Sequence, residues 1–565
     1  MPRTLKGSTT PMPAGDLDAL PAGLEDAAEA AAHGEFEPEP DGRPEIRIST
    51  AEASVVKQAL RALTADPDIY ARGGHLARVT SEAPRPGKRP ESIVRDPDAP
   101  RIAPLPEPWV QVRLAADANW FRAGKDPETG LPVWLPAHPP LWAVRAVATA
   151  GQYPGMRPLV GVVETPTLRA DGTILDRPGY DESTGLIYRP LGRPPQIPAR
   201  PSRADALAAR DRLLDVVRDF PFARPEHEGA WLAAVLTPLC RWAFAGSTPL
   251  FLFDANTRGA GKSLLARVAA LIATGRSPPA TTLPADEDER RKRMTAFALA
   301  GDSLMLLDNV EGVLGGATLN AALTTDAWAD RILGSSVTTG TLPWRTVILA
   351  TGNNATLGAD TARRTVQIKL ESPEERPEAR QGFAHPDLVA WVRAERARLV
   401  GDALTICRGY FVAGRPDMRL PAMGSFEGWS LVRQIVTWAG LPDPLTSQVA
   451  LAETADREAA LLRGLLDGLG AAVAHLGRPA TVRGLLDFAT GPDGHELRDL
   501  LAEHLPGRDG GLPDARRLSA RLRHLRGRVS GGRAIDLDGS GHGGRDLWVV
   551  RQATPAAERE PGQEG

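Results

Sequence analysis

Residues 249–275, PLFLFDANTRGAGKSLLARVAALIATG, combine the residue types that bind a nucleotide phosphate. An apolar run is followed by a glycine-containing turn, then by Gly-Lys-Ser and an apolar-periodic segment that predicts a helix. Small residues let backbone N–H groups surround a phosphate, a lysine reaches the β and γ oxygens, and a hydroxyl binds Mg²⁺. The helix that follows would point its positive end at the anion. The candidate nucleotide-binding residues are Asn256, Gly259, Ala260, Gly261, Lys262, Ser263 and Leu264.

The loop departs from the phosphate-binding consensus at one position, where Asn256 stands in place of a glycine. Asparagine tolerates a positive φ better than most residues, so we expect the loop to close. The alternative is an ordinary strand–turn–helix that carries a surface lysine. Segments further along the chain favour the phosphate-binding interpretation.

Two later segments place polar residues at the ends of apolar, strand-like runs. Asp308 follows the apolar residues of 303–308, SLMLLD, and P-loop ATPases hold Mg²⁺ with an acid at the tip of such a strand. Asn353 and Asn354 end residues 346–354, TVILATGNN. The alternatives are a core strand that ends in a turn and an asparagine-rich turn.

A basic pair, Arg363 and Arg364, precedes the alternating run TVQIKLE at residues 365–371. An arginine here could serve as a finger that reaches the ATP of a neighbouring subunit. The alternative is a solvated basic pair. Each of these signals is weak alone, but their order after the loop is much harder to obtain by chance.

The strings DANTRGAGKS, LMLLDN, ATGNN and ADTARRTVQIKLE resemble the ATPase core of superfamily 3-type AAA+ helicases. The likeness is greatest to the helicase part of the primase-helicase proteins of phages, plasmids and integrated elements. Residues 166–188 resemble the segment before the motor in those proteins, and residues 424–444 resemble the region after it. The resemblance covers roughly the middle two-thirds of the chain.

This resemblance implies ATP and Mg²⁺ as cofactors, a homo-hexameric ring and a role for each motif. The implied roles are β/γ-phosphate binding for Lys262, Mg²⁺ binding for Ser263 and Asp308, γ-phosphate sensing for Asn353 or Asn354, and the finger for Arg363 or Arg364.

One departure from the family pattern concerns the catalytic base. Many AAA+ motors carry a glutamate directly after the strand-end aspartate, whereas this chain has Asn309. Glu311 lies two residues further on, and strand alternation would keep it on the face of Asn309 rather than that of Asp308. The base is therefore unassigned, and slow hydrolysis is compatible with the sequence.

A polar, β-prone run between two glycines at residues 331–343 predicts a hairpin before the sensor strand. In superfamily 3-type helicases such a hairpin enters the ring channel and grips DNA. Arg331, Ser335 and Ser336 are then candidate phosphate contacts. The alternative is an ordinary surface hairpin.

The C-terminal region reads as three helices followed by two strands, which is the order of a winged helix. Arginines recur at helical spacing on the third helix, as expected of a helix that contacts DNA. The alternative is a solubilising helix. The candidate DNA-binding residues here are Arg516, Arg517, Arg521, Arg523 and Arg526.

Length and composition limit the class of protein. A chain of 565 residues is too long for one ordinary domain and suggests about three or four. No apolar run is long enough to span a bilayer, which predicts a cytoplasmic protein without membrane contact. The 2 cysteines, Cys240 and Cys407, lie in apolar helical contexts and are interpreted as buried thiols. A net charge of −3 means that DNA binding must come from local patches.

Composition shifts and turn signals divide the chain into regions. The expected regions are a disordered tail at 1–44, a mixed α+β region at 45–200, a helical collar at 201–247, the motor at 248–375, a post-motor helical region at 376–455, a winged-helix-like domain at 456–551 and a second tail at 552–565. The predicted fold class is an α/β P-loop AAA+ ATPase core with a mixed α+β N-terminal region, a helical collar and a C-terminal winged-helix-like domain.

The function that this sequence favours is an ATP-dependent DNA helicase or translocase for replication of a mobile element, acting on single-stranded or duplex DNA. The N-terminal 200 residues contain no acidic constellation for primer synthesis, so a separate primase or polymerase is expected. Two alternatives remain open. One is a P-loop switch or loader that remodels replication or defence partners, and the other is a non-enzymatic initiator or scaffold.

Overall fold

The computed structural model describes residues 42–81, 93–96, 98–126, 129–284, 286–310, 313–330, 339–353, 355–374, 376–455, 457–507, 511–527, 529–541 and 545–552. The chain separates into two compact units. The first consists of residues 1–67 and 106–150, and the second of residues 68–105 and 151–565.

The first unit is a small α+β fold. Its sheet has the order β1-β5-β6, in which β1 is parallel to β5 and β5 is antiparallel to β6. Three helices pack beside it around Ile46, Val110 and Leu114, which are all fully buried. The elements are β1 (Glu45–Ile48), α2 (Glu52–Leu63), α3 (Glu107–Asp117), β5 (Asn119–Lys125), β6 (Pro132–Pro136) and α4 (Leu141–Ala148).

The centre of the second unit is a five-stranded, all-parallel sheet with the order β13-β14-β18-β12-β20. The strands predicted around the motifs are all present in it. Their bounds are β12 (Leu250–Ala255), β13 (Ala280–Thr281), β14 (Leu304–Leu307), β18 (Val347–Asn353) and β20 (Thr365–Leu370). Because the strands are parallel, their carboxyl ends meet at one edge of the sheet.

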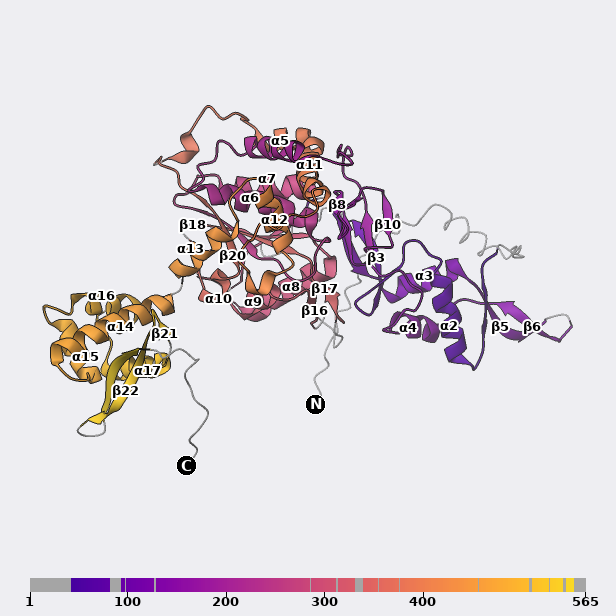
Figure 1. The fold of residues 1–565 in the computed structure, drawn as a ribbon. Helices are drawn as coiled ribbons and strands as arrows, with labels where there is room; N and C mark the ends of the chain where they lie inside the picture. The colour runs from indigo at the N-terminus through magenta and orange to yellow at the C-terminus, as the bar shows by residue number, and fades with distance from the viewer. Residues whose placement is uncertain are drawn as a thin grey trace, which may run out of the picture. The chain divides into compact units, whose positions relative to one another are not determined.

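Helices cover both faces of this sheet (Figure 1). On one face, Phe251 and Phe253 pack into a core shared with α6, α7 and α11. On the other face, Leu250 and Leu252 pack into a core shared with α8 and α9. The alternating residues of β12 are therefore buried on both sides, as its continuous apolar run requires. The helices are α6 (Pro225–Cys240), α7 (Lys262–Thr274), α8 (Glu287–Ala300), α9 (Ala317–Ala322), α10 (Ala359–Ala362) and α11 (Leu388–Val412).

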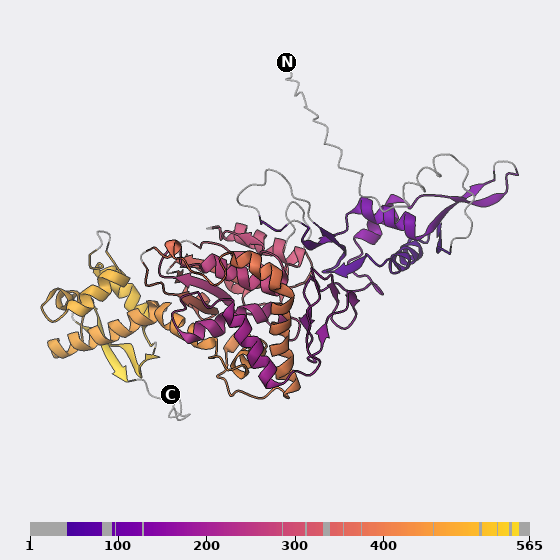
Figure 2. The ribbon, with the colours of Figure 1, turned by 90° about the horizontal axis from the view of Figure 1, so that it is seen from above.

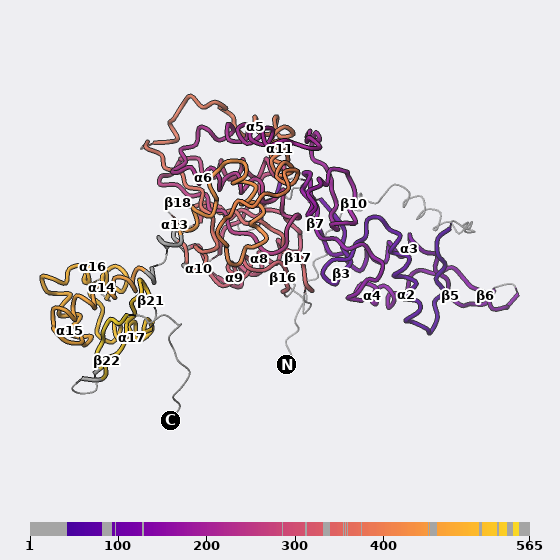
Figure 3. The backbone as a smooth tube through the Cα atoms, in the orientation of Figure 1, coloured from indigo at the N-terminus to yellow at the C-terminus, as the bar shows by residue number. Residues whose placement is uncertain are grey.

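Before the parallel sheet, the chain forms short strands and then α5 (Arg203–Asp215). Ser202 caps this helix as predicted, in a reciprocal pair with Asp205. The helix lies alongside α11 (Figures 1 and 3). The preceding strands are β2 (Tyr70–Arg72), β3 (His75–Ser81), β4 (Pro100–Pro104), β7 (Gly161–Val163), β8 (Thr167–Leu168), β9 (Ile174–Leu175), β10 (Gly179–Asp181) and β11 (Leu186–Tyr188).

Several short elements lie between and after the main strands. Strands β16 (Ala327–Trp328) and β17 (Leu342–Pro343) pair antiparallel, which is the arrangement expected at the base of the predicted hairpin. The hairpin residues 331–338 lie outside the described residues. The other elements are β15 (Val313–Leu314), β19 (Thr356–Leu357), η1 (Pro377–Ala379), η2 (Gly424–Phe426), α12 (Ser430–Trp438) and α13 (Leu445–Ala455).

The C-terminal region has its own apolar core, around the fully buried Leu501, Leu522 and Trp548. Its helices precede its strands, as predicted, but the described residues form four helices and three strands where three helices and two strands were expected. The elements are α14 (Arg457–Leu476), α15 (Val482–Thr490), α16 (His495–His504), α17 (Ala515–Leu525), β21 (Val529–Ser530), β22 (Arg533–Gly541) and β23 (Arg545–Gln552).

The structure bears on two predictions made from composition, one about the cysteines and one about membrane-spanning segments. The thiols of Cys240 and Cys407 are fully buried as predicted, with their Sγ atoms 3.4 Å apart. In the part of the chain that the structure describes, no helix has the length and apolarity to cross a bilayer.

Candidate nucleotide site

The predicted motor residues meet at the carboxyl edge of the parallel sheet. The strand order places β18 between β14 and β12, so Asp308, Asn353 and the loop after Ala255 follow three neighbouring strands. Asn353 is the direct register partner of Ala255. Ligands of open α/β sheets bind beyond this edge.

The loop after β12 has the backbone that anion binding requires. Gly259 and Gly261 have φ values of 80° and 93°, which are left-handed conformations that favour glycine. Gly261 directly precedes α7, a helix of 13 residues that begins with Lys262 and Ser263. A Cβ on Gly261 would lie only 2.8 Å from the Phe220 ring, so packing as well as φ requires glycine here.

The expected explanation for Asn256 is wrong. This residue is not among the described residues with positive φ. It closes the loop through its side chain instead: its Nδ2 donates to the Ser372 carbonyl and its Oδ1 accepts from the Ser372 N–H, both at 3.1 Å. Ser372 follows β20, so the loop is tied to the neighbouring strand rather than turned by an unusual φ.

Asp308 is positioned by a residue that the sequence analysis missed, Thr351 on β18. The fully buried Thr351 hydroxyl donates to Asp308 Oδ1 at 2.7 Å and accepts from the Asn309 N–H at 2.7 Å. A fixed strand-end carboxylate of this kind fits a Mg²⁺ site. The signal in the sequence is that Thr351 lies two residues before Asn353, on the same side of the strand.

The strand-alternation argument about Asn309 is also wrong. Strand β14 ends at Leu307, and Asn309 has a φ of 49°, so it occupies a turn and not an extended position. Asparagine is one of the few residues that adopt this conformation readily. Glu311 and Asn354 lie outside the described residues.

A second buried carboxylate, Asp254, lies just before the loop and is only 3% exposed. It accepts hydrogen bonds from the Ala355 N–H at 3.2 Å and from Gln367 Nε2 at 3.1 Å. Burial raises the pKa of Asp254. Through Ala355, Asp254 thereby holds the segment that follows Asn353. The Oδ1 atom of Asn353 is itself buried and has no hydrogen-bond partner among the described residues.

The arginine pair lies at the opposite edge of the sheet. The carbonyl of Arg364 accepts from the Leu250 N–H at 2.9 Å, at the start of β12. The six residues of β12 span about 17 Å, which separates Arg364 from the loop of its own chain. Arg364 pairs with Asp360, while Arg363 is exposed. Neither arginine therefore contributes to the site of its own chain.

A cavity of about 210 Å³ adjoins the loop and is walled mainly by apolar side chains. Its floor includes Gly259, Ala260 and Gly261. Asp219 also lines this cavity. Its Oδ2 accepts a hydrogen bond from the Ala384 N–H at 2.8 Å, which joins it to the lining segment that contains Phe383. Such a cavity suits a nucleoside whose phosphates lie on the loop. The apolar wall is formed by Val216, Phe220, Pro221, Leu264, Phe383 and Leu388.

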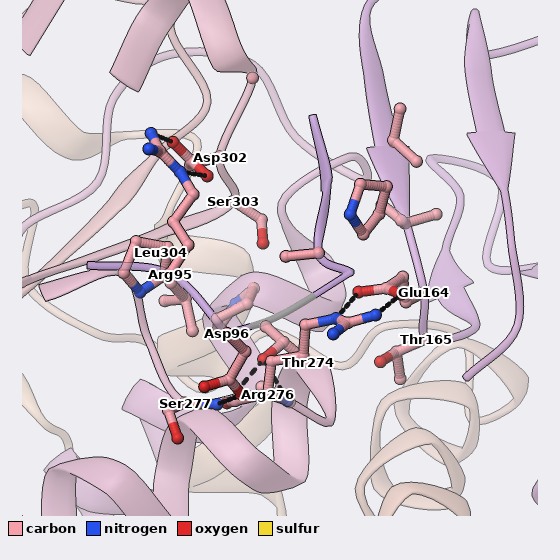
Figure 4. Close-up of a pocket in the computed structure, with 18 of the residues that line it drawn as sticks. Arg95, Asp96, Glu164, Thr165, Thr274, Arg276, Ser277, Asp302, Ser303 and Leu304 are labelled. Carbon is pink, nitrogen blue, oxygen red and sulfur yellow. Dashed lines mark hydrogen bonds and ion pairs between the residues drawn. The ribbon is translucent and has the colours of Figure 1, made fainter. Parts of the chain in front are cut away.

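A different cavity lies at the amino ends of β13 and β14 (Figure 4). Its charged side chains pair with one another: Arg95 Nη2 is 2.6 Å from Asp302 Oδ2, and Arg276 Nη2 is 2.6 Å from Glu164 Oε1. These pairs join β-rich segments before the motor to the sheet. Because its charges are neutralised internally and it lies far from the loop, this cavity is not the candidate nucleotide site.

The predicted DNA contacts are only partly described. Arg331, Ser335 and Ser336 lie outside the described residues. In the C-terminal region, Arg516, Arg517 and Arg521 are on α17, as predicted, and Arg516 and Arg517 are exposed.

Two further C-terminal arginines pair with acids of the β-hairpin. Arg523 Nη2 is 2.7 Å from Asp546, and Arg526 Nε is 3.0 Å from Asp536. Arg526 is the C-cap residue of α17 rather than part of the helix.

No protein-family model matches the sequence, and no curated protein matches it. Among solved structures, the chain is similar to two apo A-form structures of the C-terminal region of NrS-1. One has 10% identity over 76% of this chain and 95% of that chain, with a TM-score of 0.34; the other has 11% identity over 79% and 99%, with a TM-score of 0.32. JCV helicase has 14% identity over 42% of this chain and 67% of that chain, with a TM-score of 0.20. TM-scores of this size do not establish a shared fold, so the function has to be inferred from the site itself.

Proposed function

We propose that this protein is a P-loop ATPase that drives translocation along DNA, as a helicase or translocase of a mobile element. The observation that supports this function is the meeting of the glycine loop, Asp308 and Asn353 at the carboxyl ends of three neighbouring strands. These residues fit ATP and Mg²⁺. The loop has the required positive φ values, Asp308 is fixed by Thr351, and Asn353 has an orphaned buried oxygen.

In this proposal each residue of the nucleotide site has a defined role. Lys262 and the N–H groups at the start of α7 bind the β- and γ-phosphates. Ser263 and Asp308 hold Mg²⁺, which neutralises phosphate charge as hydrolysis proceeds. Asn353 orients the attacking water. The apolar cavity beside Phe220 binds the base.

The position of the arginine pair supports a ring. Arg363 is exposed at the edge of the sheet away from the loop, where an arginine reaches a neighbouring subunit and not its own ATP. We infer that copies of the chain assemble head to tail, as a hexamer, with an arginine finger across each interface. Priming would come from a separate primase or polymerase.

The hairpin and the C-terminal region would supply DNA contacts. The hairpin predicted at residues 331–343 would grip DNA in the channel. Helices α15, α16 and α17 and the β22–β23 hairpin of the C-terminal region would act as a winged-helix-like domain that contacts DNA through Arg516, Arg517 and Arg521.

The test is steady-state ATP hydrolysis with and without single-stranded DNA, with Lys262→Ala as the control. Hydrolysis that DNA stimulates and that Lys262→Ala abolishes is the expected result. A rate that DNA does not change would contradict a DNA-driven motor. Hydrolysis that survives in Lys262→Ala would contradict the assignment of the site.

A second candidate function is a slowly hydrolysing switch that remodels partner proteins, and the observation that favours it is Asn309. The residue after Asp308 carries an amide side chain and not a carboxylate. The backbone N–H of Asn309 donates a hydrogen bond to the Thr351 hydroxyl. Because Asn309 has a φ of 49°, aspartate is a better test than glutamate, which would strain the turn. A large rate increase in Asn309→Asp would favour the switch, whereas an unchanged rate would remove this position from the chemistry.

A further inference from the structure

The helices of the first unit cover one face of its sheet at β1 and at the start of β5, and they leave the other face open. On the covered face, Ile46 is fully buried and Trp120 is 3% exposed, with its Nε1 donating to the Leu114 carbonyl of α3 at 2.8 Å. Strands β5 and β6 continue past helices α2, α3 and α4 as a protruding hairpin (Figures 1 and 2). The side chains that alternate with the buried ones therefore lie on the open face.

The open face carries two aromatic rings and two cations. Strand register places Arg47 beside Phe121, and Trp134 opposite Ala123. Because Phe121, Ala123 and Lys125 alternate along β5, they share this face with Trp134. Trp134 is 42% exposed, although the Arg47 guanidinium lies 5.3 Å from its ring centroid.

Other residues of this unit limit what could bind. Pro132 and Pro136 lie at the two ends of β6 and lack N–H donors, so this edge is unsuited to adding another strand. Glu45 Oε2 lies 3.5 Å from Arg47 and offsets part of its charge at the rim. Exposed Ala123, Pro132 and Pro136 adjoin the rings on this face, but Arg47 and Lys125 lie among them, and burying these cations under an apolar protein surface would be costly.

Accessible aromatic rings beside cations are the pattern that binds single-stranded nucleic acid; here Trp134 is exposed and Phe121 is half-buried. Every base has a flat face that stacks on an aromatic ring, and the phosphates that join the bases need cations beside the rings. Phe121 and Trp134 occupy diagonal positions on neighbouring strands, about 7–8 Å apart. Duplex bases are stacked on one another and do not offer these faces, so the geometry favours a single strand.

We propose that the open face of β1, β5 and β6 binds single-stranded DNA, with bases stacked on Phe121 and Trp134 and phosphates contacting Arg47 and Lys125. Binding at this face requires neither ATP nor the glycine loop. It gives the first unit a role that the motor does not supply, namely capture of the strand on which the motor acts.

The test is fluorescence anisotropy of a labelled oligothymidylate with the full-length, nucleotide-free protein. Trp134→Ala is expected to weaken binding about tenfold, because loss of one stacked base costs about 1–3 kcal/mol. Trp134→Phe should keep most of the affinity. In a plot of the logarithm of the association constant against the logarithm of the salt concentration, Lys125→Ala should make the negative slope shallower by about 0.7. An oligouridylate arm distinguishes DNA from RNA as the preferred strand.

Two matched controls separate this face from general surface effects. Leu141→Ala removes an apolar side chain that is 58% exposed at the start of α4. Arg122→Ala removes an exposed cation from the opposite face of β5. Neither should change the affinity. Equal losses in Trp134→Ala and Leu141→Ala, or no loss in either, would overturn the proposal.

Photocrosslinking with 5-iododeoxyuridine in the oligonucleotide locates the contact directly. Crosslinked peptides from residues 119–136 are expected, and crosslinks confined to the motor or the C-terminal region would contradict the site. The Lys262→Ala protein should crosslink at the same residues. A protein that does not hydrolyse ATP can therefore still show strand binding at this face, so the two proposals are tested independently.

Discussion

The contact between Thr351 and Asp308 offers the sharpest test of the nucleotide site. Thr351→Val replaces the hydroxyl by a methyl group of similar size, so it removes both hydrogen bonds without opening a large cavity. The Asp308 carboxylate loses its 2.7 Å donor, and the Asn309 N–H loses its acceptor. A hydrogen bond to a charged group contributes about 1.5–3 kcal/mol, which corresponds to about 10- to 150-fold in an equilibrium constant.

We expect Thr351→Val to raise the Mg²⁺ concentration needed for half-maximal ATP hydrolysis and to lower kcat, each by about 10- to 100-fold. Thr351→Ser is the matched control, because it keeps the hydroxyl and loses only a methyl group. The assay is ATP hydrolysis titrated with Mg²⁺, with circular dichroism to check that both variants are folded. If valine and serine variants show the same Mg²⁺ dependence as the native protein, Thr351 does not position Asp308.

Three further changes test other parts of the structure. Gly261→Ala should abolish ATP binding, because the φ of 93° and the Phe220 ring at 2.8 Å both exclude a Cβ, and a fluorescent ATP analogue that still binds would refute this. Asp254→Ala should lower kcat at least tenfold while the dissociation constant for ATP changes less than about threefold, because Asp254 holds the segment after Asn353 and does not contact the phosphates in the proposed site. Single-turnover kinetics and equilibrium binding measure the two effects separately, and a parallel loss of affinity would contradict this role. Burial raises the pKa of Asp117 from 3.8 to about 6, so between these pH values the folded first unit holds a proton that the unfolded chain has released. The free energy of unfolding should therefore fall as pH rises from about 4 to 6, by about 1–2 kcal/mol, because the carboxyl is only half-buried and solvent screens it. Urea unfolding of Asp117→Asn should show a flatter pH profile over that window, and an unchanged profile would rule out this carboxyl as the source.

Much of the parallel-sheet region could be predicted because its signals are local. A continuous apolar run, a glycine-containing loop and an amphipathic helix all lie within residues 249–275, and each reflects its own burial and backbone geometry. The same holds for Asp308 at the end of β14, for Asn353 at the end of β18 and for the Ser202 cap. Alternation of side chains along a strand is likewise present in any single sequence.

The tertiary structure decided which of these segments meet. Thr351 contacts Asp308 only because β18 is inserted beside β14, and Asn256 contacts Ser372 only because β20 flanks β12. Strand order depends on how helices cover the two faces of the sheet, and no local pattern encodes it. The backbone of Asn309 was also set by such a contact, since its N–H binds the Thr351 hydroxyl in a left-handed turn.

The sequence by itself therefore determined the chemical groups that the chain offers: a glycine-containing loop before a helix, a strand-end acid, a strand-end amide and a basic pair. Only the tertiary structure decided that the first three share one edge of a sheet and that Arg363 and Arg364 lie about 17 Å away at the other. The physical reason is that residue types and periodicity follow from local burial, whereas distances between strands follow from packing that involves the whole sheet.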